Sequence, residues 1–183
     1  MSRTILPEPP AHLKRLSETL SDRIRAEIRE NGMIPFSRYM ERALYEPGLG
    51  YYSAGLHKLG AGGDFVTAPE IGELFAACLA RQVMEVSALL GPCDILEVGA
   101  GSGRLAAALL RLLGPDDPPG QYLILETSAD LRRVQDEHIA AAAPAWRDRV
   151  TWLDEPPAEA WSGVLLANEV IDALAVERFR IAA

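Results

Sequence analysis

The segment "ILEVGAGSGRL", from Ile95 to Leu105, constrains the fold more than any other part of the 183-residue chain. A short apolar run is followed by three glycines and then by a helix-like pattern. A strand that enters a helix through a glycine-rich turn is typical of α/β domains that bind nucleotide-like cofactors. From residue 92 onward strand-like and helix-like patterns alternate, which predicts an α/β fold with a Rossmann-like parallel sheet and crossover helices.

Hydrophobic periodicity places the expected elements along the chain. In the sheet region we expect strands at about 93–98, 121–126, 149–153 and 163–167, and helices at about 103–113, 129–142 and, as a short and poor helix, 156–160. Before the sheet, the pattern predicts an amphipathic helix over 13–31, a short helix that ends at Pro47, a glycine-rich loop, and a helix over 67–91. On the last of these, Thr67 and Glu70 fit a capping box, and Cys78 is expected on the core-facing side.

These patterns divide the chain into three expected parts. Residues 1–12 are predicted to be a loose tail, 13–91 a helical and loop cap region, and 92–183 a Rossmann-like core. The core is expected to be incomplete, because the chain stops shortly after the fourth predicted strand. That strand would then leave an apolar, unpaired edge.

The spacing of the glycines discriminates between cofactors. They stand at positions 99, 101 and 103, whereas the dinucleotide fingerprint G-x-G-x-x-G would need a glycine where Arg104 stands. Glu97, two residues before the first glycine, would oppose a pyrophosphate held at a helix N-terminus. The same carboxylate favours the sulfonium and ammonium groups of S-adenosylmethionine. We therefore expect Glu97, Gly99, Gly101 and Gly103 to bind S-adenosylmethionine, and an NAD-dependent oxidoreductase or a ligand-free tight turn are the alternatives.

Acidic and amide residues follow the other predicted strands. Glu126 can accept both ribose hydroxyls, a device that NAD enzymes share. Asp154 could reach an adenine amino group or could be a solvated turn residue. Asn168, Glu169 and Asp172 follow the fourth strand, which should lie beside the first, so they face the bound cofactor; Asn168 could also cap the next helix.

Composition limits the other classes of function. The formal net charge of −8 makes the chain a poor non-specific partner for nucleic acid or anionic membrane. Two cysteines and three histidines do not form a zinc-type or disulfide pattern, so no metal site is expected. No apolar run is long enough to cross a bilayer, and the N-terminal residues have no signal-like apolar region. We expect a cytoplasmic, bacterial protein without membrane insertion. The sequence also permits a homo-oligomer.

Five segments together resemble one known family. They are "MERALYEPGLGYY", "GGDFVTAPEIGELF", "ILEVGAGSGRL", "YLILETSADLR" and "ANEVIDALAVERF", in the same order over residues 30–180. They resemble the MidA family of class I methyltransferases, which includes the mitochondrial arginine methyltransferase that assists complex I assembly. The glycine loop is general to class I enzymes, whereas "GGDFVTAPE" and "NEVIDAL" are more specific.

The resemblance implies a Rossmann-like class I fold, S-adenosylmethionine as the cofactor and a protein substrate, with arginine as the acceptor in the mitochondrial branch. It implies that Asp64, in the "GDF" signature, folds over the cofactor, and that Asn168, Glu169 and Asp172 match the "NE..DA" signature. Ala175 departs from the family, which usually has proline there. Family members are also longer and have further strands.

These observations predict a methyltransferase that acts on protein arginine. Glu169 and Asp172 are candidates to hold the guanidinium bidentately, and Asn168 to position the cofactor or the acceptor. A role in complex I assembly, or in its bacterial equivalent, follows from the resemblance. The competing hypothesis is a truncated fragment that binds the cofactor or a protein without turnover.

Overall fold

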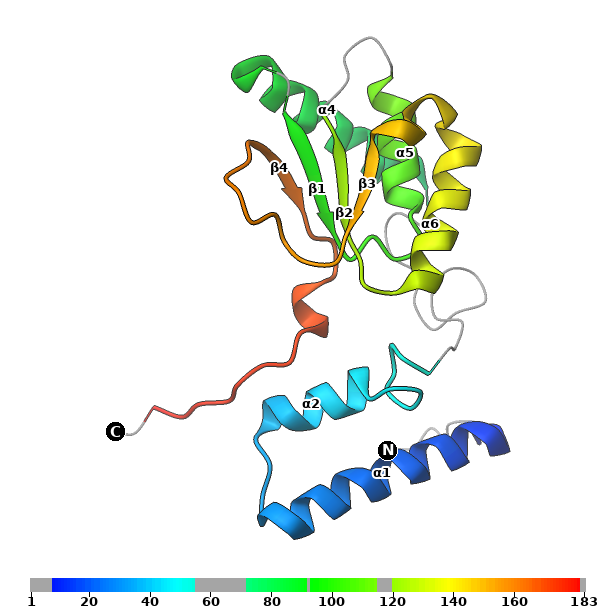
Figure 1. The fold of residues 1–183 in the computed structure, drawn as a ribbon, viewed down its shortest axis with the longest axis vertical. Coiled ribbons are helices and arrows are strands. Elements are labelled where there is room, and N and C mark those ends of the chain that lie inside the picture. The colour runs from blue at the N-terminus through cyan, green and yellow to red at the C-terminus, as the bar shows by residue number, and fades with distance from the viewer. Residues whose placement is uncertain (1–7, 55–71, 92, 115–119, 182–183) are drawn as a thin grey trace, which may run out of the picture. The chain divides into compact units, whose positions relative to one another are not determined.

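The computed structural model describes residues 8–54, 72–91, 93–114 and 120–181. The chain divides into two compact units, one of residues 1–56 with 172–183 and the other of residues 57–171. Figure 1 shows the helices and strands of both. The glycine-rich loop with Asp64, the expected capping box of Thr67 and Glu70, and residues 1–7 of the tail lie outside the described residues.

The unit of residues 57–171 contains a parallel sheet. Its described strands are paired in the order β3-β2-β1-β4, with β1 (Asp94–Val98), β2 (Tyr122–Leu125), β3 (Val150–Leu153) and β4 (Gly163–Leu166). Helix α5 (Arg104–Leu113) connects β1 to β2, and α6 (Ala129–Ala142) with the 3-10 helix η1 (Pro144–Arg149) connects β2 to β3. The strand order therefore reverses between β1 and β4, where α/β sheets bind their ligands. The predicted Rossmann-like fold class is confirmed.

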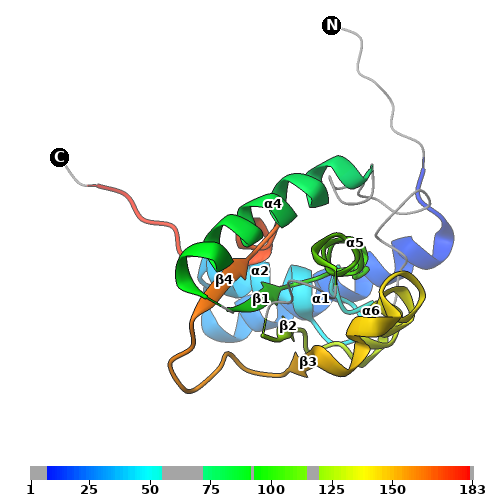
Figure 2. The ribbon, with the colours of Figure 1, turned by 90° about the horizontal axis from the view of Figure 1, so that it is seen from above.

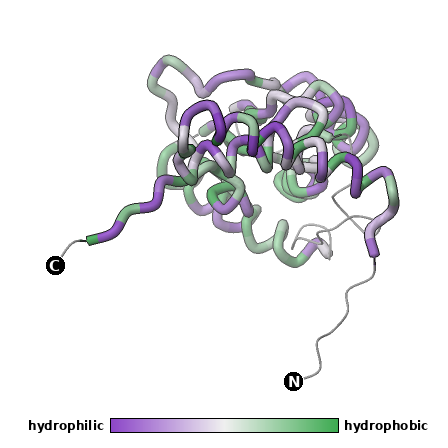
Figure 3. Tube along the Cα trace, turned by 90° about the horizontal axis from the view of Figure 1, so that it is seen from below, coloured by the Kyte–Doolittle hydropathy of each residue, from purple (hydrophilic) through white to green (hydrophobic). Residues whose placement is uncertain are grey.

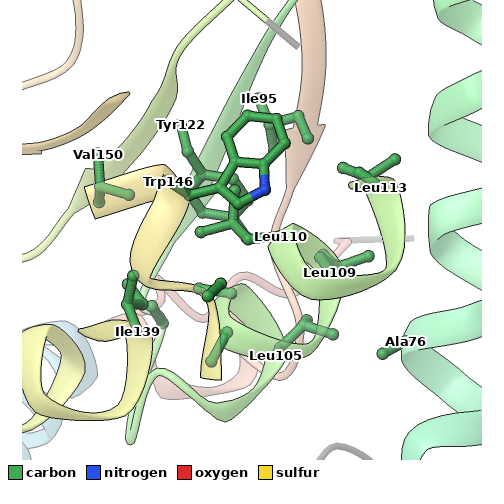
Figure 4. Packing of buried hydrophobic residues seen from close by; sticks show 14 of the residues in the cluster. Ala76, Ile95, Leu105, Leu109, Leu110, Leu113, Tyr122, Ile139, Trp146 and Val150 are labelled. Atoms are coloured by element: carbon green, nitrogen blue, oxygen red, sulfur yellow. The ribbon is translucent and has the colours of Figure 1, made fainter. Parts of the chain in front are cut away.

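The hydrophobic core lies on one face of this sheet. Helices α4 (Glu73–Leu90), α5 and α6 lie on the same side of the strands (Figure 2). Ile95 of β1 and Tyr122 of β2 are register partners, and both are fully buried with Leu109, Leu110 and Ile139 of the helices (Figure 4). The alternation of side chains along a strand thus brings Glu97, two residues after Ile95, to this same inner face.

The buried face of α4 differs from the prediction. Cys78 is exposed, and so is Leu74, whereas Ala76, Ala80 and Val83 form the buried stripe. Small side chains allow α4 to pack closely on α5, with Phe75 and Leu79 partly buried beside them, so the prediction that Cys78 lies on the core-facing side was wrong. Because α4 packs against α5 and β4, it belongs with the sheet, whereas the sequence placed it in the N-terminal region.

The predicted helix near 156–160 is also wrong. Residues 154–162, all of which the structure describes, form turns and irregular backbone. Pro156 and Pro157 lack the backbone N–H groups that a helix would use. A 3-10 helix, η1, lies on the other side of β3, in the connection from α6. It begins at Pro144 and buries Trp146 in the core.

The unit of residues 1–56 and 172–183 contains α1 (Ala11–Asn31) and α2 (Phe36–Tyr45), both close to the predicted helices. Ion pairs connect them: Glu27 contacts Arg38 and Arg42, and the buried Glu46 contacts Arg42 and Arg23. The C-terminal segment alternates hydrophobic and hydrophilic residues (Figure 3). No helix among the described residues is long and apolar enough to cross a membrane.

Candidate cofactor site

The carboxyl ends of the four strands meet at the lower edge of the sheet in Figure 1, and the candidate residues of the sheet unit lie there. The glycine loop follows β1 and leads into α5. Its glycines at 99, 101 and 103 have φ angles of 64°, 56° and 78°. These angles are strained for residues that carry a Cβ. The loop backbone is therefore open to close approach, and α5 begins directly after it, so that the positive end of the helix dipole lies at the loop.

At two of these glycines a side chain would also meet a neighbouring residue. A Cβ on Gly99 would lie 3.1 Å from Cγ2 of Val170, in the segment after β4. A Cβ on Gly103 would lie 2.8 Å from Cα of Gln135, in α6. The loop is thus packed between the end of β4 and α6, and its position depends on both.

Glu97 is buried beneath the loop rather than exposed at the strand end. Only 3% of its surface is exposed, and the Tyr122 hydroxyl donates to Glu97 Oε2 at 2.7 Å. Burial raises the pKa of Glu97 to about 7, although the Tyr122 hydrogen bond opposes the rise. Burial and the adjacent carboxyl also raise the pKa of Tyr122. A cation near the loop would lower the pKa of Glu97 and favour its charged form.

Glu126 directly follows β2, and two donors fix its carboxylate. Oε1 accepts from the Ser128 backbone N–H at 2.9 Å, and Oε2 accepts from Gln135 Nε2 at 3.3 Å. An ionised carboxylate has about four acceptor positions, so each oxygen can accept one further hydrogen bond. Glu126 is partly exposed and is therefore accessible to a pair of ligand hydroxyls.

Asp154 follows β3 and is exposed. Its Oδ1 accepts from Arg132 Nη2 at 2.8 Å, and Arg132 Nε donates to the Glu126 backbone carbonyl at 2.6 Å. Arg132 therefore connects the ends of β2 and β3. An exposed ion pair with Arg132 is compatible with both interpretations of Asp154, the solvated turn residue and the acceptor for an adenine amino group.

The segment after β4 lies beside the glycine loop. Because β4 pairs with β1, its chain leaves the sheet next to Gly99, and Val170 contacts that glycine. Glu169 has a φ angle of 52°, in the left-handed region that non-glycine residues rarely adopt. The 3-10 helix η2 begins at Ile171, so Asn168 lies too early in the chain to be its N-cap. Backbone strain such as the left-handed φ angle of Glu169 is often found at functional sites.

Asp172 belongs to the other unit, with residues 1–56. There the Tyr45 hydroxyl donates to the Ala173 carbonyl at 2.6 Å. The pKa of Tyr45 is raised by burial and, to a smaller extent, by Tyr52 and Asp172. Asp172 therefore lies close to a pair of stacked tyrosines, whose ring centroids are 5.4 Å apart.

A family model described as "Putative S-adenosyl-L-methionine-dependent methyltransferase" matches residues 78–183, more than half of the chain. The chain belongs to this methyltransferase family. The matched residues include the glycine loop, Glu126 and the segment after β4. The family resemblance inferred from the sequence is confirmed.

Relatives that are named as methyltransferases are longer than this chain. The mitochondrial protein arginine methyltransferase NDUFAF7 of Danio rerio is 28% identical over 90% of this chain and 44% of its own length. The Drosophila melanogaster homolog is 27% identical over 89% of this chain and 42% of its own length. A Burkholderia thailandensis protein crystallised with S-adenosyl-homocysteine is 46% identical, with a TM-score of 0.85 over 93% of this chain and 46% of that protein. The chain thus spans less than half the length of each.

Sequence reasoning missed two buried polar residues of the candidate site. Tyr122 was assigned only as a strand residue, and Gln135 only as part of a helix. A signal for Gln135 exists, because it interrupts an apolar row with Leu131 and Ile139 at a spacing of four. A polar residue in such a row indicates a buried hydrogen-bonding role.

Proposed function

We propose that the chain binds S-adenosylmethionine at the carboxyl ends of β1 and β2 and transfers its methyl group to a protein, with an arginine side chain as the acceptor. The main support is the pairing of the glycine loop with the fixed carboxylate of Glu126. A protein that binds S-adenosyl-homocysteine shares this architecture at 46% identity. Both observations concern binding, and the acceptor is inferred from more distant relatives that are named as protein arginine methyltransferases.

Different residues of the chain would bind different parts of the cofactor. The loop of Gly99, Gly101 and Gly103 would approach it by backbone, with Glu97 beneath as the counter-charge. Glu126 would accept the ribose hydroxyls. Asp154, held through Oδ1 by Arg132, has Oδ2 available for the adenine amino group. When bound, S-adenosylmethionine supplies a methyl group activated by its sulfonium.

The acceptor would be held after β4. A carboxylate pairs with a guanidinium through two parallel hydrogen bonds, which also orients the attacking nitrogen. We assign this role to Glu169, with Asp172 as the second carboxylate and Asn168 as a positioning amide. The nitrogen–methyl bond forms as the sulfur–methyl bond breaks, and the nitrogen loses its proton to a carboxylate or water. The protein contributes mainly alignment and electrostatics to such a displacement.

Part of this proposal rests on the family alone. Asp64 is assigned to cover the cofactor from its signature, and it lies outside the described residues. A role in complex I assembly, a bacterial cytoplasmic location, a possible homo-oligomer and the lack of nucleic-acid binding remain predictions.

The second candidate function is cofactor binding without turnover. It is supported by the glycine loop and the Glu126 carboxylate, which account for binding of the cofactor alone. The two candidates share the cofactor site and differ only in methyl transfer.

Incubation with tritiated S-adenosylmethionine and an extract of bacterial protein separates them. Label in protein, located on arginine by mass spectrometry, supports the enzyme. Glu169→Gln should retain cofactor affinity and lose most of the transfer, whereas an exposed control on α6, Glu137→Gln, should lose none. Binding without label supports the second candidate, and undiminished transfer by Glu169→Gln contradicts the role of that residue.

A further inference from the structure

Gln135 is a fully buried amide in the middle of α6. None of its surface is exposed. The residues four positions before and after it on the helix, Leu131 and Ile139, are apolar. An amide buried without partners destabilises a fold by several times RT, so its hydrogen bonds decide what it costs. Here both ends of the amide have partners, and no buried polar side-chain atom of the described residues lacks one.

The partners of Gln135 come from three different parts of the site. Its Nε2 donates to the Gly101 carbonyl at 3.0 Å and to Glu126 Oε2 at 3.3 Å. Its Oε1 accepts from Trp152 Nε1 at 2.8 Å. One side chain therefore connects the loop after β1, the acid after β2, and strand β3.

Contacts next to this amide hold it in register with the loop. The backbone of Gln135 approaches Gly103 so closely that a Cβ on the glycine would lie 2.8 Å from Gln135 Cα. One turn later, His138 Nδ1 donates to the Ser102 carbonyl at 2.6 Å. Two side chains of α6 that are three residues apart thus bond to the carbonyls of two successive residues of the glycine loop.

The bond to Glu126 has a direct consequence for a ligand. With Ser128 N–H on Oε1 and Gln135 on Oε2, the plane of the carboxylate is set before any ligand arrives. Acceptors that are already oriented bind hydroxyls without the entropy cost of ordering them. Packing alone does not explain an amide at this position, because an apolar side chain of similar size would fill the same space without a desolvation cost.

We propose that Gln135 is a positioning residue for the cofactor ribose: it orients the Glu126 carboxylate and fixes the glycine loop against it. The inference rests on the proposed binding of S-adenosylmethionine. It goes further by separating the residue that contacts the ribose from the buried residue that sets its geometry.

The test uses two ligands that differ only in the ribose: S-adenosylhomocysteine and its 2′,3′-dideoxy analogue, titrated into the full chain by calorimetry. Gln135→Met keeps the volume and the contact with Gly103 but removes all three hydrogen bonds. We expect it to weaken S-adenosylhomocysteine binding about tenfold and the dideoxy analogue by much less. The preference for the ribose hydroxyls should therefore fall.

Ile139→Val is the matched control, because Ile139 is equally buried on the same helix and has no polar contact with the site. It should lower the Tm without changing the ribose preference. Trp152→Phe is a second variant should Gln135→Met not fold: it leaves Gln135 in place, frees its Oε1, and should reduce the preference by a smaller factor.

The inference is overturned if Gln135→Met weakens the binding of both ligands equally. If Trp152→Phe is the variant measured, it is overturned by an unchanged preference for the ribose hydroxyls. If the wild type binds both ligands equally well, Glu126 does not read the ribose and the inference also fails. If the wild type binds neither, the proposed function itself fails. The wild-type titrations thus distinguish the failure of the proposed function from that of the role of Gln135.

Discussion

Replacing Glu97 by glutamine should make the stability of the protein less dependent on pH. Glu97 is 3% exposed, and its pKa is raised from 4.5 to about 7, mainly by burial. Between these values the folded state binds a proton that the unfolded state has released. Stability from this group is therefore fully present below about pH 4.5 and is lost as the pH rises through 7. Because of the raised pKa of Glu97, the free energy of unfolding should be roughly 3 kcal/mol lower at pH 8 than below pH 4.5.

Glu97→Gln removes the charge and keeps a side-chain oxygen that can accept from the Tyr122 hydroxyl. The free energy of unfolding, measured by urea denaturation with circular dichroism at pH 5 and pH 8, should fall between these pH values by roughly 2–3 kcal/mol more in the wild type than in the variant. Glu169→Gln, with the same charge change at an exposed position, is the control and should follow the wild type. Parallel pH dependence of the wild type and Glu97→Gln would refute the reasoning.

Three further predictions follow from the site and its surroundings. S-adenosylmethionine should bind more tightly at pH 8 than at pH 6, because a cation favours the ionised form of Glu97, and calorimetry should show that Glu97→Gln loses this difference. Gly103→Ala should lower the Tm much more than Gly114→Ala. Both glycines have left-handed φ angles, which cost an alanine about 1 kcal/mol, but only an alanine at position 103 would also clash with α6. Equal losses of Tm in the two variants would contradict that contact. Ellman's reagent should modify exposed Cys78 in the native protein and buried Cys93 only after unfolding, so two equally fast thiols would contradict the structure of α4.

The fold was predictable because its signals are local. The glycines after β1 and the alternation of short apolar strands with helices identify a parallel sheet without knowledge of any distant contact. Glu126 could be predicted for the same reason, since the residue that follows a parallel strand always lies at the ligand edge. The predicted helix near 156–160 failed because a weak periodic pattern was given more weight than Pro156 and Pro157.

The errors inside the site have a different cause. Cys78 was placed in the core because it falls on the predicted apolar face of its helix, whereas Ala76 and Ala80 are buried and permit the close packing of α4 on α5. The hydrogen bonds of Gln135 join three segments far apart in the sequence, and periodicity contains no information about such partners. Glu97 was singled out as the acid before the glycine loop, but its burial and its hydrogen bond to Tyr122 of β2 depend on contacts that the sequence pattern does not show.

Titration of the full chain with S-adenosylhomocysteine in a calorimeter, with NADH titrated in parallel, shows whether the glycine loop and Glu126 bind this cofactor. We expect saturable binding of S-adenosylhomocysteine, weakened about tenfold by Glu126→Gln, and no binding of NADH. Saturable binding of NADH without binding of S-adenosylhomocysteine would contradict this expectation.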